Sequence, residues 1–158
     1  MRKTLLLFLI LVVSVAIQAA FLSHFVWAPD IVLIIVLFAG IFLRLQTGLW
    51  VALAAGFLRG CFSPDALFLN MMMFPLLAVS AGAFAGAFYK HDPGIQLFTV
   101  AMATVIMILA HTFYVSRMAD NAVNLSYLLR VNIWHIATTV IISPLIFLLL
   151  KIPIKMKE

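Results

Sequence analysis

The chain has 158 residues, of which 66% are hydrophobic and 9% are charged, and its formal net charge is +5. Soluble domains are about half apolar and a quarter charged, so this composition indicates a protein that lipid solvates, with no room for a second, soluble domain. The cations lie singly along the chain and form no basic stripe, which argues against nucleic-acid binding. The single cysteine, Cys61, excludes an intrachain disulfide and a cysteine-built metal site.

The first apolar run follows Arg2 and Lys3 and resembles a signal peptide. It is longer than the usual apolar region of such a peptide, and no small-residue cleavage site of the Ala-x-Ala kind follows it. We therefore expect a retained first helix.

Polar residues, proline and glycine divide the rest of the chain into five more apolar runs. A helix needs about 20 apolar residues to cross the hydrocarbon core of a bilayer. The sequence therefore predicts an all-α integral membrane protein, folded as one compact bundle of about six transmembrane helices. The predicted spans are residues 4–22, 29–43, 47–62, 66–89, 95–115 and 127–150.

The second and third runs are short, which leaves two interpretations open. They are either two short spanning helices or one re-entrant hairpin that never crosses, and the charge bias of the loops cannot separate these cases. We favour two short spans, with the Arg59 side chain extending toward the outer surface.

The positions of lysine and arginine predict the orientation of the bundle, because cytoplasmic loops carry an excess of both. With both termini in the cytoplasm, the inner side holds seven of the ten cations, including all five lysines. The inner cations are Arg2, Lys3, Arg44, Lys90, Lys151, Lys155 and Lys157, and the outer ones are Arg59, Arg117 and Arg130.

Small residues recur at four-residue spacing in the third and fourth runs. The third run has Gly48, Ala52, Gly56 and Gly60, and the fourth has Ala78, Gly82 and Gly86. Small residues let helix backbones approach closely, and this packing drives helix association in lipid. Either the two faces pack on each other, or one of them binds a helix of another protein. We expect the third run to be enclosed by close packing and the fourth to present a partner-helix face.

Polar residues gather toward the predicted outer half of the bundle. This outer polar cluster consists of Arg59, Asn70, His111, Arg130, Asn132 and His135. Polar groups at membrane depth normally face protein or water, so the cluster is either an internal hydrogen-bond network, which we favour, or an outward-facing small-molecule pocket. Two histidines on different helices do not make a metal motif. The sequence therefore predicts no catalytic residue, metal or cofactor.

The order of local motifs resembles that of the MreD family of bacterial rod shape-determining proteins. The second run opens with Pro29-Asp30 and an aliphatic stretch to Leu37. The third carries Gly56-Phe57 and Gly60, a turn with Ser63 follows, and the fourth has Asn70 near its start and then Gly82 and Gly86. The resemblance is best over residues 29–89 and only hydropathic after Ile95.

The resemblance implies a non-enzymatic subunit of the cell-elongation machinery in the bacterial cytoplasmic membrane, surrounded by membrane lipid. Such a subunit would bind MreC and help link MreB filaments to RodA and a class B penicillin-binding protein during peptidoglycan synthesis. The family is also similar in fold to the S-components of energy-coupling-factor transporters. The alternative hypothesis is therefore an S-component that binds a vitamin in its outer half and uses the Ala16 and Ala20 face for coupling.

Overall fold

The computed structural model describes residues 2–20, 25, 28–62, 66–88, 92–118 and 125–154. The regular structure in these ranges is α-helical, which confirms the predicted all-α fold. The six helices are α1 (Arg2–Ala20), α2 (Ile31–Phe42), α3 (Leu45–Phe62), α4 (Leu67–Ala87), α5 (Pro93–Met118) and α6 (Leu125–Ile154). Each overlaps the span predicted for it and differs at its ends by a few residues.

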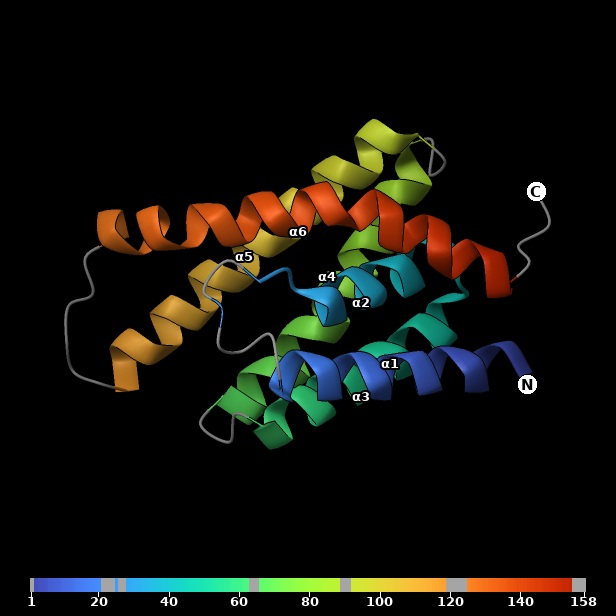
Figure 1. Ribbon diagram of the computed structural model, residues 1–158, viewed down its shortest axis with the longest axis horizontal. Coiled ribbons are helices and arrows are strands. Elements are labelled where there is room, and N and C mark those ends of the chain that lie inside the picture. The colour runs from blue at the N-terminus through green and yellow to red at the C-terminus, as the bar shows by residue number, and fades with distance from the viewer. Residues whose placement is uncertain are drawn as a thin grey trace.

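Helix α2 lies at the centre of the bundle and contacts each of the other five helices (Figure 1). It is apolar on every side, and no side chain from Val32 to Ala39 is more than 1% exposed. A helix with apolar residues all round is stable in a position where all of its sides are buried. The central place of α2 therefore follows from its composition.

The six helices differ in whether they are long enough to cross a membrane. Stretches of α3, α4, α5 and α6 are long and apolar enough to do so, whereas Leu5–Ala20 of α1 and the whole of α2 are shorter apolar helices. The 12 residues of α2 extend about 18 Å, against about 30 Å for the hydrocarbon core. The chain is thus a membrane protein, and the crossing of the second and third predicted spans remains a prediction.

Helix α5 begins two residues before the predicted span, inside the proline–glycine segment where the sequence indicates a loop. Asp92 precedes the helix, and its Oδ1 accepts a hydrogen bond from the Gly94 N–H at 2.7 Å. Proline fits the first turn of a helix because its missing N–H would have no intrahelical acceptor there. Pro93 therefore begins α5 instead of only stopping α4.

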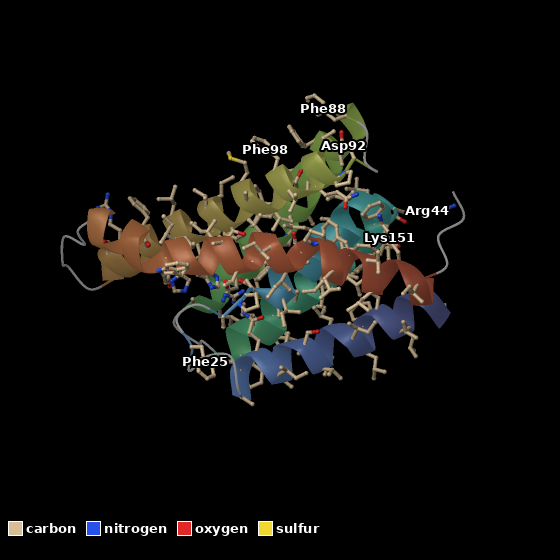
Figure 2. All side chains as sticks on the ribbon, turned by 45° about the horizontal axis from the view of Figure 1, so that its top comes forward. Phe25, Arg44, Phe88, Asp92, Phe98 and Lys151 are labelled. Atoms are coloured by element: carbon tan, nitrogen blue, oxygen red, sulfur yellow. The ribbon has the colours of Figure 1, made fainter. Side chains whose placement is uncertain are left out.

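The two ends of the bundle are distinct. Helix α1 begins and α6 ends at the same end (Figure 1). Arg44 and Lys151 also lie toward that end, whereas Phe25 lies toward the other (Figure 2). This arrangement agrees with termini on one side of a membrane, and the assignment of that side to the cytoplasm remains a prediction.

Candidate functional site

Asp30 caps the N-terminal end of the central helix. Its Oδ1 accepts a hydrogen bond from the Leu33 N–H at 3.0 Å. A carboxylate in this position complements the partial positive charge at a helix N-terminus. The residue is only 2% exposed, and a buried carboxylate needs further hydrogen bonds or a cation.

Arg59 of α3 supplies the cation. Its Nη1 donates to Oδ2 of Asp30 at 2.5 Å, and its guanidinium lies 5.6 Å from the centroid of the Phe74 ring on α4. The predicted extension of Arg59 toward the outer surface remains a prediction, and the structure adds the partner of its charge. The side chain is 28% exposed and turns to Asp30, because the buried carboxylate is the nearest site at which its charge is neutralised.

Two more side chains connect Asp30 to helices distant in sequence. Gln18 of α1 donates from Nε2 to Oδ1 of Asp30 at 3.2 Å and accepts from the Val32 N–H at 3.3 Å. Thr139 of α6 accepts from the Asp30 N–H at 3.1 Å, and its hydroxyl donates to the carbonyl of His135 at 2.7 Å. We call Gln18, Asp30, Arg59 and Thr139 the Asp30 network. It joins α1, α2, α3 and α6.

Three members of the predicted outer polar cluster lie in or beside this network. Arg59 belongs to it, and the backbone carbonyl of His135 accepts the Thr139 hydroxyl. His111 of α5 is exposed and interacts electrostatically with Arg59. The structure therefore brings Arg59, His111 and His135 toward one site, built around a carboxylate that the predicted cluster did not include.

The other three members are placed differently. Asn70 of α4 is 1% exposed, and its Oδ1 accepts no hydrogen bond from the residues that the structure describes. Asn132 of α6 is partly buried and has an interaction partner. The side chain of Arg130 lies outside the described residues. Within the described ranges, no three His, Cys, Asp or Glu side chains are grouped so that they could hold a metal ion.

The small residues of α3 lie against the backbones of α2 and α4. A Cβ on Gly48 would be 3.2 Å from the Ala39 carbonyl oxygen, and one on Gly56 would be 2.6 Å from that of Asn70. A Cβ on Gly60 would overlap Leu67, and Ala52 is fully buried. This face of α3 is therefore occupied by the chain itself.

The small residues of α4 do not share one environment. Ala78 is 3% exposed, and a Cβ on Gly82 would be 2.7 Å from the carbonyl oxygen of Gly40 in α2. Around Gly86, by contrast, an added Cβ would meet nothing within 4 Å. A row of every fourth residue turns about 40° per step around an α-helix, so the row leaves the α2 contact and reaches the surface at Gly86.

Comparison with known protein families identifies the bundle. The model of the rod shape-determining protein MreD matches residues 2–152. The chain belongs to the MreD family. No curated protein and no solved structure matches it. The match to MreD covers α5 and nearly all of α6 as well, and so extends beyond residues 29–89, where the sequence resemblance is clearest.

Membership of the MreD family makes the chain a membrane component of the bacterial rod-shape machinery, with a structural role in determining cell shape. This agrees with a site made of an ion pair and amide and hydroxyl hydrogen bonds, all of which join helices. The chemistry that the Asp30 network supports best is therefore the fixing of helix positions inside the membrane.

Sequence reasoning missed three residues that this MreD-family chain depends on for packing: Gln18, Asp30 as a buried group, and Gly40. A signal for Asp30 was present, since an aspartate directly before an aliphatic run is a typical helix N-cap. Gly40 stood alone in its run and belonged to no four-residue repeat. Its contacts with Ala78 and Gly82 become visible only when α2 and α4 are placed together.

Proposed function

We propose that this MreD-family chain is a non-catalytic subunit of the cell-elongation complex in the bacterial cytoplasmic membrane. It binds MreC there and helps to link MreB filaments to RodA and a class B penicillin-binding protein. The observation that carries the proposal is the family match over residues 2–152.

The interior of the bundle favours the hypothesis of a scaffold and argues against a vitamin-binding S-component. A vitamin binder needs a hollow in its outer half, lined by polar groups that converge on the ligand. Here the side chains of α2 fill the centre, and Arg59 and Asp30 satisfy each other at the N-terminal end of α2. A filled, cross-connected interior gives the rigid shape that a partner helix can recognise.

The outward surface of α4 is where we place the MreC transmembrane helix. Ser80, Ala83, Gly86 and Ala87 are all exposed there. We call these four residues the α4 small face. Such a face lets a second helix approach closely, and close approach is the main source of helix affinity in lipid. Ala78 and Gly82 contact α2 instead, so within the predicted partner face Gly86 is the residue left for a partner.

The test is capture of MreC from detergent extracts by the Gly86→Leu variant, normalised to the amount of each bait protein. Nothing lies within 4 Å of an added Cβ at Gly86, so we expect normal abundance. Overpacking a close contact costs about 1–3 kcal/mol, which is about a fivefold to 150-fold loss of affinity. We expect MreC capture to fall within that range.

Two variants serve as controls for this experiment. Ala16 on α1 is exposed, so Ala16→Leu makes a matched change on another helix and should capture MreC normally. Gly82→Leu should lower abundance, because its side chain would collide with α2. Equal MreC capture by wild type and Gly86→Leu would exclude the α4 small face, and a loss only in Ala16→Leu would move the contact to α1.

A further inference from the structure

Two cations that are far apart in the sequence lie at the same end of the bundle. Arg44 is exposed and lies two residues after the end of α2, and Lys151 lies in the last turn of α6. The Lys151 Nζ is 4.8 Å from the centroid of the Phe42 ring, two residues before Arg44. Figure 2 shows both cations at the end where α6 finishes.

No acidic side chain of the described ranges neutralises this pair. The described acids are Asp30, which is paired with Arg59 at the opposite end of α2, and Asp92, which accepts the Gly94 N–H at the start of α5. Like charges repel, and the repulsion grows where water is partly excluded. An anion bound at this end would therefore offset the repulsion between Arg44 and Lys151.

The neighbours of the two cations indicate what kind of anion this is. Leu45, next to Arg44, is 62% exposed, and Ile152, next to Lys151, is 65% exposed. Both cations are thus flanked by apolar side chains that are exposed on the surface of the bundle. A ligand that matches this surface has a negative head and an apolar body.

We propose that Arg44 and Lys151 bind the phosphate of an anionic phospholipid, whose acyl chains lie along Leu45 and Ile152. The site is independent of MreC binding, since it shares no residue with the α4 small face. A basic residue at a membrane surface contributes about 1 kcal/mol to its attraction for anionic lipid, so each cation should strengthen binding about fivefold.

The experiment titrates phosphatidylglycerol into the purified full-length protein in neutral detergent and measures bound lipid by native mass spectrometry. Arg44→Gln and Lys151→Gln should each bind about fivefold more weakly than wild type, and the double variant about 30-fold more weakly. Phosphatidylcholine, whose head is neutral overall, should bind the wild type as weakly as phosphatidylglycerol binds the double variant.

Arg117 offers a matched control at the other end of the molecule. It is an exposed cation whose guanidinium lies 5.2 Å from the centroid of the Phe113 ring, so Arg117→Gln removes a cation from a comparable aromatic contact. This variant and the charge-preserving Lys151→Arg should bind phosphatidylglycerol like the wild type. Thermal unfolding of the glutamine variants in the same detergent separates a loss of binding from a failure to fold.

Three results would overturn the proposal. If the double variant binds phosphatidylglycerol as tightly as the wild type, Arg44 and Lys151 do not form a binding site. If Arg117→Gln loses as much affinity as the other glutamine variants, the loss reflects the overall charge of the protein and not a site. Displacement of phosphatidylglycerol by an equal concentration of glycerol phosphate would show that the acyl chains contribute nothing, and would assign the site to a soluble phosphate.

Discussion

The two carboxylate oxygens of Asp30 have different partners. Oδ1 accepts hydrogen bonds from the Leu33 N–H and the Gln18 amide, whereas Oδ2 accepts from Arg59. The first pair of contacts needs only an acceptor, which an asparagine would also supply. The contact with Arg59 needs the negative charge, because removal of either partner leaves an uncompensated charge at membrane depth.

At the scale of residues we expect Arg59→Met to destabilise the bundle strongly. Loss of one partner of a buried ion pair costs about 3–5 kcal/mol, and the 28% exposure of Arg59 places the expected cost at the lower end of that range. Adding Asp30→Asn should restore part of the loss, since it removes the unpaired charge and keeps the helix cap. Thermal unfolding in detergent measures both effects.

The control for this cycle is Asp30→Asn alone, which leaves a partly exposed arginine without its partner. It should be less destabilising than Arg59→Met, because Arg59 can reach water and the 3% exposed carboxylate cannot. The comparison is between the decrease in unfolding temperature of the double variant and the sum of the decreases in the two single variants. If these are equal, the two charges do not interact and the ion pair has no energetic role.

At the scale of elements, the contact between α2 and α4 depends on missing side chains. Gly40 of α2 faces the backbone of Ala78, and Gly82 of α4 faces the carbonyl oxygen of Gly40. Backbone atoms cannot move aside as a flexible side chain can, so this crossing sets the distance between the two helices. It also lies within the central packing of α2, which the other helices surround.

Gly40→Ala and Gly86→Ala make the same chemical change in two surroundings. The Cβ of Gly40→Ala would overlap the Ala78 carbonyl oxygen, and we expect a loss of about 1–3 kcal/mol and lower abundance. Around Gly86 there is open space, and alanine favours helix over glycine by about 0.5–1 kcal/mol, so stability should not fall. Equal stability of the two variants would contradict the close crossing of α2 and α4.

The helices were predictable because long apolar runs separated by polar residues specify where each helix lies. Their mutual rotation was not. The repeat of Ala78, Gly82 and Gly86 reads as one face in the sequence, yet the structure distributes it from a buried contact to an exposed position. Pairing of Asp30 with Arg59 likewise depends on how two neighbouring helices are turned, and spacing along the chain carries little information about that rotation.

At the scale of the whole molecule, the positions of the chain ends and of the cations agree with each other. The beginning of α1, Arg44 and Lys151 lie toward one end, whereas Arg117 lies in the last turn of α5, which finishes at the other end. The excess of lysine predicts that the end with Arg44 and Lys151 is the cytoplasmic one.

Reporter fusions test this orientation directly. Fusions placed within residues 90–94 or after Lys151 should read as cytoplasmic, and one within residues 118–124 should read as external. The reason is the retention of lysine- and arginine-rich loops on the cytoplasmic side during insertion. A fusion to the intact C-terminus that reads as external would refute the six-span arrangement, whatever the internal fusions show.

The Asp30 network also has a consequence for the order in which the protein is completed. Asp30 and Gln18 are synthesised early, Arg59 follows 29 residues after Asp30, and Thr139 comes 109 residues after it. The hairpin of α2 and α3 can therefore enter the bilayer with its two opposite charges already paired, as a neutral unit. The Asp30 backbone N–H, however, acquires its Thr139 acceptor only when the last helix arrives. The hydrogen bonds at the start of the central helix are thus complete only when α6 is in place.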